Sequence, residues 1–330
     1  MFYIFYIIKL GFLFLLLTPS FAQAKSYKNH PNALIVLFHG LANHAASFNT
    51  MKQELEQTFP AASVIALTSV EGMQSIHYSI KEQGEINFKE LSSKVKDLGN
   101  KPMLLIGHSQ GGMRAYAFLK QYGHLLNIKG LVTLATPWEG APGARVDAAM
   151  LLHHLTGSVL HDLRRLSLAL GCPKTDLEKQ LMAYVQTNQA VCLCPGGKDL
   201  MEGSAFLYEV KKLLPDEQVP ILAIGGGQTD FSALLANRGR HHFKALNDIY
   251  TFFVVGEKYI DRYHDMQIPL YSQHARNILP KSKKKFKRVL IKDAFHSSHV
   301  WAIPVPKSKD MLSHPRVLHT VIKFAKSILK

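Results

Sequence analysis

Short, continuous runs of apolar residues recur along the chain, and helical patterns lie between them. Five runs are apolar for most of their length, namely 33–40, 62–67, 103–106, 131–137 and 219–227, and a sixth predicted strand, 287–295, has an apolar centre. A run that is apolar at every position suits a strand buried on both faces, as in a parallel sheet. Between the first two runs, Phe48, Met51 and Leu55 have helical spacing. The alternation predicts an α/β fold whose mostly parallel sheet is flanked by helices.

This alternation stops between about 138 and 217, where no segment has a convincing strand pattern. The stretch 148–170 is rich in leucine and methionine and favours helices. The interval begins directly after a predicted strand, at the sheet edge where open α/β folds bind ligands. We therefore interpret it as a helical cap, the alternative being a helical subdomain that only adds core. We expect a second insertion at about 231–262, with 250–259 as a further strand.

The N-terminal segment 1–24 is apolar apart from Lys9 and ends in Ala22-Gln23-Ala24. A short apolar stretch followed by small residues at this spacing is typical of a secretory signal peptide. It predicts a secreted or periplasmic protein, and the alternative is a membrane anchor that is not cleaved. The remaining residues, 25–330, suffice for one large α/β domain with a cap.

Three cysteines occur in the chain, namely Cys172, Cys192 and Cys194. Disulfides form in exported proteins, so we expect Cys172 to pair with Cys192 or Cys194.

The formal net charge is +15, and its one dense run of basic residues is 281–288. No zinc-finger spacing or nucleic-acid-binding module accompanies the basic residues, so we expect no nucleic-acid partner. We interpret the run as a solvated loop before a strand. The alternative is contact with an anionic membrane surface.

The segment "MLLIGHSQGGMRAY" places Ser109 between Gly107 and Gly111, where a predicted strand passes into a predicted helix. A serine nucleophile at such a turn stands clear of the backbone, and the flanking glycines let the strand and helix approach closely. The spacing and its context predict that Ser109 is a catalytic nucleophile.

A serine nucleophile needs a histidine base and an acid that orients it, and in this type of fold they follow in the order serine, acid, histidine. Asp265 is favoured as the acid, because its separation from the last histidines leaves room for one helix and one strand. Asp230, directly after a predicted strand, is the alternative. Both His296 and His299 follow the last predicted strand, and either can be the base. No acid or cysteine accompanies them at metal-ligand spacing, which argues against a metal site.

The tetrahedral intermediate of acyl transfer also needs two N–H donors. We expect one from Gln110, the residue after the serine. The other is expected from Leu41, in the loop after the first strand, where Gly40 allows a tight turn.

The motifs "VLFHGL", "GHSQGG" and "LATPWEGAP" occur in this order and resemble those of α/β-hydrolases, especially bacterial lipases and lipase-like esterases. The resemblance implies an acid in a turn similar to Asp265-Met-Gln-Ile-Pro, where Met266 replaces the usual glycine. The lipase pattern of an aromatic residue four positions before the base falls on Phe295 and favours His299. A more general hydrolase pattern falls on His296.

The resemblance implies a serine hydrolase that cleaves carboxylic esters, as a lipase or esterase, by a Ser-His-Asp triad and an acyl-enzyme. Its partner is then a lipid or other ester substrate, and no cofactor is required. Many such lipases carry a structural calcium held by two aspartates, but the sequence shows no convincing pair. The alternatives are a phospholipase, an acyltransferase or a non-catalytic binding protein with the same fold.

Overall fold

The computed structural model describes residues 33–145, 150, 153–154, 157–171, 176–235, 242–256, 262–279, 281–282, 285–300 and 303–329. The expected signal peptide and Cys172 lie outside these residues, so export and the disulfide stay predictions. Within the described part of the chain, no helix combines the length and the apolar character needed to cross a membrane.

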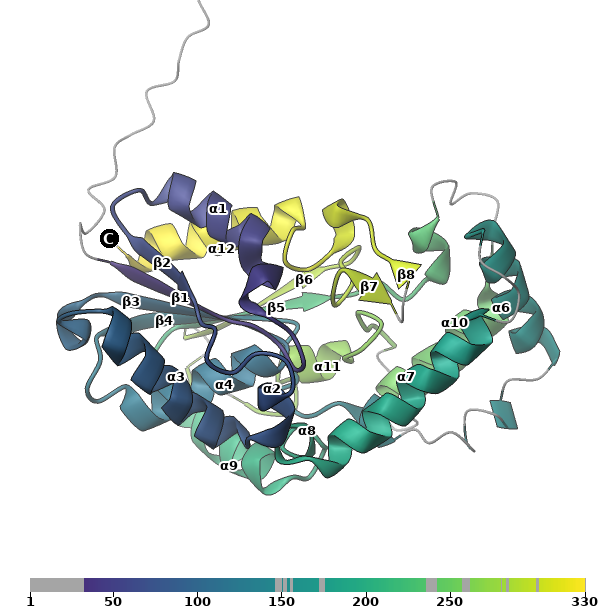
Figure 1. Ribbon diagram of the computed structural model, residues 1–330, viewed down its shortest axis with the longest axis horizontal. Coiled ribbons are helices and arrows are strands. Elements are labelled where there is room, and N and C mark those ends of the chain that lie inside the picture. Colours follow the sequence, from purple (N-terminus) through teal and green to yellow (C-terminus); the bar gives the residue numbers. More distant parts are fainter. Residues whose placement is uncertain are drawn as a thin grey trace, which may run out of the picture.

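The centre of the molecule is a sheet of six parallel strands (Figure 1). The strands are β1 (Leu34–Phe38), β2 (Ser63–Ala66), β3 (Met103–His108), β4 (Ile128–Leu134), β5 (Ile221–Gly226) and β6 (Phe286–Ile291). Their order is β2-β1-β3-β4-β5-β6, and every neighbouring pair is parallel. The predicted α/β class with a parallel sheet is therefore confirmed.

Helices cover both faces of the sheet, which explains why the central strands β1 and β3 are buried at every position. Along β1, Leu34, Val36 and Phe38 join the core on one face. The intervening Ile35 and Leu37 join the core on the other. The first face is covered by α3 (Ile80–Lys94), α4 (Gln110–Tyr122) and α9 (Ala205–Leu213), and the second by α1 (Asn49–Thr58) and α12 (Pro315–Ile328) (Figure 1).

The remaining elements lie mostly beyond the carboxyl ends of the strands. The helices there are α2 (Gln74–His77), α6 (Gly157–Ala169), α7 (Asp176–Leu193), α8 (Pro195–Lys198), α10 (Lys244–Val255) and α11 (Leu270–Gln273). Two short strands, β7 (His299–Val300) and β8 (Ile303–Pro304), form an antiparallel pair.

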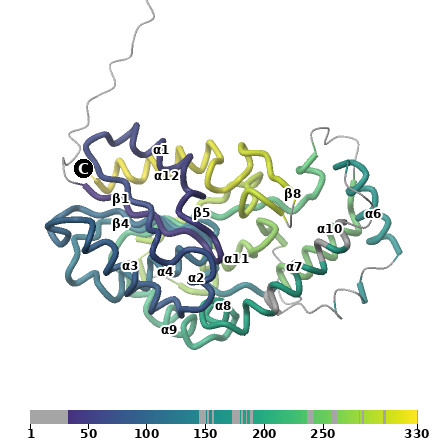
Figure 2. Tube along the Cα trace, viewed as in Figure 1, coloured from purple at the N-terminus to yellow at the C-terminus, as the bar shows by residue number. Residues whose placement is uncertain are grey.

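Helices α6, α7 and α10 stand to one side of the sheet (Figure 2). In the described residues between β4 and β5 there is no strand, and α6 to α9 occupy this interval. The strand predicted over 250–259 is wrong, because α10 continues to Val255. Leu246, Tyr250 and Val254 lie at intervals of four residues and pack into one cluster with Leu163 and Leu166 of α6, which favours the helix.

The basic run leads into β6 at the start of that strand. The Lys281 N–H donates to Pro215 O, and Lys285 O accepts from the N–H of Ile221, the first residue of β5. The lysines described in this run therefore lie at the amino ends of the strands, at the opposite edge from the carboxyl ends.

The packing of α4 against β1 yields a stability prediction. A Cβ atom at Gly111 would lie 2.0 Å from Phe38 O and 2.4 Å from His39 O. We expect Gly111→Ala to lower the free energy of unfolding by about 1–3 kcal/mol, because two backbone segments must separate to admit the methyl group. Urea denaturation measures this change. Gly143→Ala is the matched control, because its nearest neighbour would lie at 3.7 Å. Equal unfolding midpoints for the two variants would contradict the prediction.

Candidate active site

Ser109 lies in the turn between β3 and α4, with φ of 53° and ψ of −127°. This left-handed region is strained for a residue with a side chain. Its neighbours leave no room to relax, because a Cβ atom at Gly107 would lie 2.3 Å from Gly111 O. The tight crossing of strand and helix therefore holds the Ser109 hydroxyl clear of the sheet, at the carboxyl end of β3.

A hydrogen-bonded chain connects Ser109 to a histidine and an aspartate. The His296 Nε2 atom lies 3.0 Å from Ser109 Oγ, and His296 Nδ1 lies 2.8 Å from Asp265 Oδ2. Asp265 is fully buried and His296 is 4% exposed. The three side chains come from the ends of different elements and meet above the carboxyl edge of the sheet.

Of the two candidate histidines, the structure brings His296 to Ser109. The preferred candidate, His299, begins β7 with an exposed side chain, and its Nδ1 atom lies 3.0 Å from Ser298 Oγ. Phe295 is buried and bonded to Lys309 O and the Met311 N–H, which fixes the chain just before His296. The turn after β6 is thus shorter than the lipase pattern implies, and His296 is the residue beside Ser109.

Of the two candidate acids, the structure brings Asp265 to the site and leaves Asp230 elsewhere. The Asp230 carboxylate accepts from the Ser232 N–H (2.9 Å) and from Asn247 Nδ2 (2.9 Å). It caps a short 3-10 helix, Phe231–Leu234, and its carboxylate also binds α10 through Asn247 and not His296 or Ser109.

The Asp265 carboxylate is oriented by its own loop. Its Oδ1 atom accepts from the N–H groups of Gln267 (3.0 Å) and Ile268 (2.7 Å), which leaves Oδ2 directed at His296. The loop fits closely over β5, because a Cβ atom at Gly226 would lie 2.8 Å from the Asp265 Cβ. Gly226 is thus required for Asp265 to reach this position.

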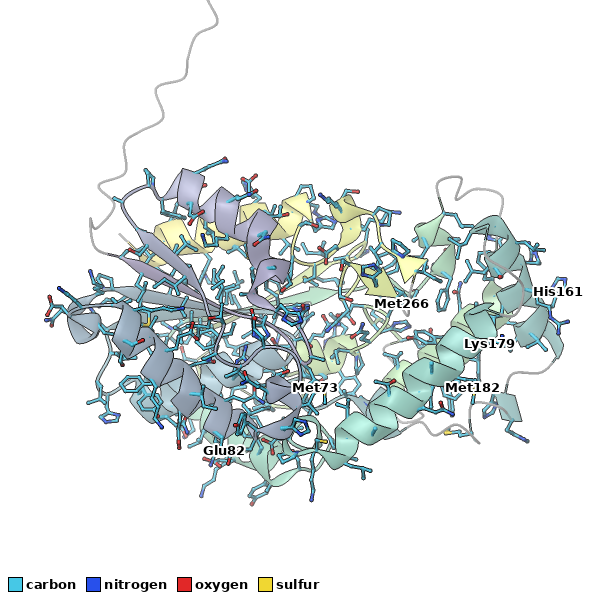
Figure 3. The ribbon with its side chains drawn as sticks, viewed as in Figure 1. Met73, Glu82, His161, Lys179, Met182 and Met266 are labelled. Carbon is cyan, nitrogen blue, oxygen red and sulfur yellow. The ribbon has the colours of Figure 1, made fainter. Side chains whose placement is uncertain are left out.

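Met266 follows the acid and adopts a φ of 75°, in the region that favours glycine. Two bonds hold it there: its N–H donates to His264 Nδ1 (3.0 Å), and its carbonyl accepts from Tyr250 Oη (2.8 Å). Met266 lies between the sheet and the helices α6 and α10 (Figure 3). The acid loop is therefore anchored on α10.

Three buried histidines directly precede residues of the site. His39 Nδ1 donates to Gly40 O (2.9 Å), and His108 Nε2 donates to His296 O (2.8 Å). Because its Nδ1 accepts from Met266, His264 carries its proton on Nε2, which lies 3.0 Å from Thr251 Oγ1. Burial lowers the pKa of His108 to about 3, and those of His39 and His264 to about 4. Each ring is therefore neutral at pH 7 and acts as a structural hydrogen-bonding group.

The expected N–H donors flank the serine. A Cβ atom at Gly40 would lie 3.1 Å from the Ser109 Cβ, so the loop after β1 passes directly beside the nucleophile. Leu41 lines the same pocket as Ser109 and His296. Gln110 is the first residue of α4, where a helix N–H has no intrahelical partner.

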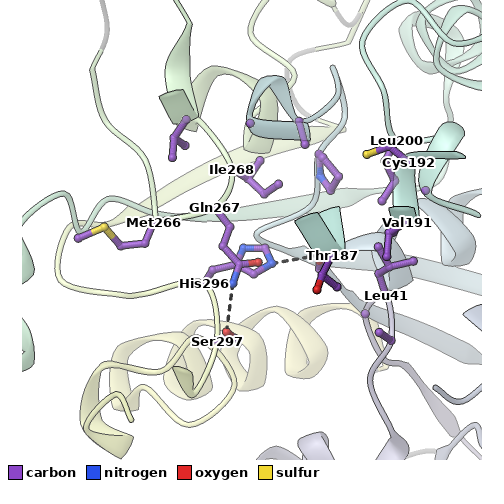
Figure 4. A pocket seen from close by; sticks show the side chains of 18 of the residues that line it. Leu41, Thr187, Val191, Cys192, Leu200, Met266, Gln267, Ile268, His296 and Ser297 are labelled. Carbon is purple, nitrogen blue, oxygen red and sulfur yellow. Dashed lines mark hydrogen bonds between the residues drawn. The ribbon is translucent and has the colours of Figure 1, made fainter. Parts of the chain in front are cut away.

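A pocket of about 320 Å³ opens beside Ser109. Its wall includes Leu41 and Leu200, together with Val185, Val191 and Cys192 of α7 and Tyr250, Phe253 and Val254 of α10. Figure 4 shows Met266, Gln267, Ile268, His296 and Ser297 on one side and Leu41, Val191, Cys192 and Leu200 on the other. Helices α7 and α10 and the carboxyl edge of the sheet thus enclose a mainly apolar space next to Ser109.

A resident metal ion has no evident site in the residues described, where no group of three or more His, Cys, Asp or Glu side chains could hold one. Cys194 forms no disulfide with the other described cysteine, and its Sγ lies 3.7 Å from Ala190 O.

The sheet order, the turn at Ser109 and the three meeting loops define an α/β-hydrolase fold, and the predicted resemblance to this superfamily is confirmed. A family model described as palmitoyl protein thioesterase matches residues 34–191, from β1 to within α7. No curated protein matches the sequence.

Several solved structures are similar to this chain. A metagenomic carboxyl esterase superposes with a TM-score of 0.51 and 13% identity over 89% of this chain and 76% of that chain. The mature lipase BlEst2 of Bacillus licheniformis superposes with a TM-score of 0.49 and 12% identity, over 91% of this chain and 94% of that chain. Naproxen esterase of Bacillus subtilis superposes with a TM-score of 0.45 and 13% identity, over 89% of this chain and 83% of that chain.

The sequence reasoning overlooked several residues that support the site. His108 is part of the "GHSQGG" motif, so its position beside the nucleophile was a signal. Arg114 is the one charged residue in the segment 111–119 of α4, which is another signal that the pattern contained. Nothing in the pattern around His264 connects this residue with the site, because it acts through tertiary contacts.

The three lowered histidine pKa values yield a prediction about acid stability. A histidine whose pKa is lower in the folded chain than its ordinary 6.5 binds a proton in the unfolded chain first. The contribution of these three neutral histidines to the free energy of unfolding is therefore complete above about pH 6.5, and it is lost as the pH falls towards 4. We expect the thermal midpoint to drop steeply across this window.

A substitution separates this effect from general acid denaturation. His264→Asn keeps an acceptor near the Met266 N–H but does not titrate, so its thermal midpoint should depend less on pH between 6.5 and 4. His319→Asn, at an exposed position of α12, is the control and should follow the wild type. The same pH dependence in all three proteins would refute the contribution of His264.

Proposed function

We propose that the chain is a serine hydrolase that cleaves carboxylic esters through an acyl-enzyme. The observation that carries the proposal is the continuous hydrogen-bonded chain Ser109–His296–Asp265 at the mouth of an apolar pocket. Ser109 is the nucleophile, His296 the general base and Asp265 the acid that orients it.

In the first half-reaction, the Ser109 hydroxyl oxygen attacks the acyl carbon while His296 Nε2 accepts the hydroxyl proton. The negative charge on the former carbonyl oxygen is stabilised by the N–H groups of Leu41 and Gln110. The intermediate collapses, His296 gives its proton to the leaving group, and the acyl group stays on Ser109. Asp265 keeps Nδ1–H fixed, so that Nε2 faces the serine throughout.

In the second half-reaction, a water molecule gives a proton to His296 and attacks the acyl carbon. The carboxylic acid leaves when Ser109 regains the proton. Both halves use the same groups and restore the starting state, so the reaction needs no cofactor.

The pocket supports an apolar acyl group as the part of the substrate that is bound. Its wall is formed largely by aliphatic and aromatic side chains from α7, α10 and the acid loop. Polar residues, namely Asn43, Gln267 and Ser297, line it as well. We assign the apolar wall to the acyl chain, because burial of its methylene groups is favourable.

A thioester is the second candidate substrate class, since the family model matched by residues 34–191 describes a palmitoyl protein thioesterase. The same serine attacks an oxygen ester or a thioester. The two substrates differ in their leaving group. A thiolate needs less protonation by His296 than an alkoxide does, because a thiol is the stronger acid.

Labelling with a fluorophosphonate tests the nucleophile. Ser109 should be the labelled serine, and Ser109→Ala should remove labelling and lower kcat on a p-nitrophenyl acyl ester by at least about 10³-fold. Measuring the same acyl chain as an oxygen ester and as a coenzyme A thioester ranks the two substrate classes. A folded wild-type protein that is not labelled and hydrolyses neither substrate would support a non-catalytic binding protein instead.

Paired substitutions test the roles of the base and the acid. We expect His296→Ala and Asp265→Asn each to lower kcat by about 10³- to 10⁴-fold, because the proton acceptor or its orientation is lost. His299→Ala and Asp230→Asn are the matched controls and should stay within about threefold of the wild type. Steady-state kinetics on proteins with native circular dichroism measures all four, and a larger loss for either control would move the assignment to that residue.

A further inference from the structure

Arg114 is fully buried in α4, yet it forms no ion pair within the described chain. Its Nη2 atom donates to His39 O (2.8 Å), and its Nη1 atom donates to Gln83 Oε1 (3.3 Å). The guanidinium also lies 5.9 Å from the ring centroid of Phe38. A buried cation without a carboxylate is costly. Its main contact is the carbonyl that begins the loop after β1.

The other end of this loop is held by Ser75. Ser75 Oγ accepts from the Ala42 N–H (2.7 Å) and donates to Gly72 O (2.7 Å). Ala42 has a φ of 54°, a left-handed conformation that an alanine adopts only when its surroundings impose it. The Ser75 hydroxyl therefore fixes the residue directly after Leu41.

The two attachments belong to one buried network. Gln83 Nε2 donates to Ser75 O (2.8 Å), and Gln83 Oε1 accepts from Arg114. Gln110 Nε2 also donates to Ser75 O (3.0 Å) and to Gly196 O of α8 (3.0 Å). The residue after the nucleophile is thus bonded to the same backbone carbonyl as the side chain that contacts Arg114.

We propose that Arg114 and Ser75 are positioning residues that clamp the segment 39–42 at both ends and thereby aim the Leu41 N–H at the developing oxyanion. This inference rests on the proposed function, and it adds to it the side chains that set the geometry of the oxyanion loop. Neither side chain lines the pocket. Both therefore act through the loop and not on the substrate.

A small displacement of the segment 39–42 should lower kcat strongly, because this segment packs closely against Ser109. A Cβ atom at Gly40 would already lie 3.1 Å from the Ser109 Cβ. Loss of one oxyanion donor costs about 10²- to 10³-fold in kcat, and a misplaced donor costs part of that. The ground-state ester makes weaker use of the donor, so KM should change little.

Two variants and two matched controls test the clamp. Ser75→Ala removes one hydroxyl and Arg114→Met removes the guanidinium but keeps an unbranched side chain. Ser272→Ala is the control for the first, because Ser272 Oγ likewise accepts from an N–H (Glu139) and donates to a carbonyl (Gly140), away from the oxyanion loop. Arg288→Met is the control for the second, because Arg288 donates to the carbonyls of His274 and Ala275 and stacks on Phe286.

The measurements are kcat and KM on a p-nitrophenyl ester, the rate of fluorophosphonate labelling, the thermal midpoint, and inhibition by a fatty alcohol, which needs no oxyanion donor. We expect both clamp variants to lose about 10- to 100-fold in kcat and in labelling rate, with KM and alcohol inhibition within about threefold. Both controls should keep kcat within about threefold of the wild type, even if their thermal midpoints fall as much as those of the clamp variants. The double variant should lose less than the product of the single losses, because both side chains hold one loop.

The outcomes separate this inference from the proposed function. Unchanged kcat in Ser75→Ala, or equal losses in the variants and their controls, overturns the clamp while labelling of the wild type at Ser109 upholds the hydrolase. Absence of wild-type labelling and activity overturns both. If Arg114→Met does not fold, the comparison of Ser75→Ala with Ser272→Ala decides alone, because each removes a single oxygen atom.

Discussion

The whole site depends on the close contact between the first turn of α4 and the strands β1 and β3. Gly107 and Gly111 touch backbone atoms where any side chain would overlap, so helix and strand cross at the shortest distance the chain allows. This contact forces Ser109 into its left-handed conformation and brings the loop after β1 beside it. The strain at the serine is balanced by the burial of the surrounding apolar strands, since the sheet is packed on both faces.

Around this rigid centre, the other groups are placed by loops that buried polar side chains hold from beneath. Asp265 is seated on β5 through Gly226, and its loop is tied to α10 by His264 and Tyr250. His296 is held from below by His108, whose ring donates to its carbonyl. Burial lowers the pKa of His264 to about 4 and that of His108 to about 3, so both rings fix geometry without placing a charge beside the pocket. The strands thus determine where Ser109, His296 and Asp265 lie, and the buried polar side chains orient the loops that carry them.

The sequence predicted the parts that follow from local pattern and failed where tertiary contacts decide. The six strands and the turn at Ser109 could be read because apolar runs and glycine spacing are local signals. The helix over 244–255 was read in part as a strand, since its β-branched and aromatic residues suit either period and only packing against α6 selects one. His299 was preferred to His296 because a family spacing was applied to a turn whose length depends on the anchoring of Phe295. The partners of Arg114, on segments far apart in the chain, have no sequence signature at all.

The parallel sheet gives the molecule a direction, and the basic run lies at one end of it. The pocket lies at the carboxyl edge of the sheet, whereas the described lysines of the basic run lie where β5 and β6 begin. An anionic surface that attracted this run would therefore meet the edge of the sheet remote from Ser109. A molecule docked in that way would hold its pocket outward, towards esters arriving from the solution and not towards acyl chains embedded in the surface beneath it.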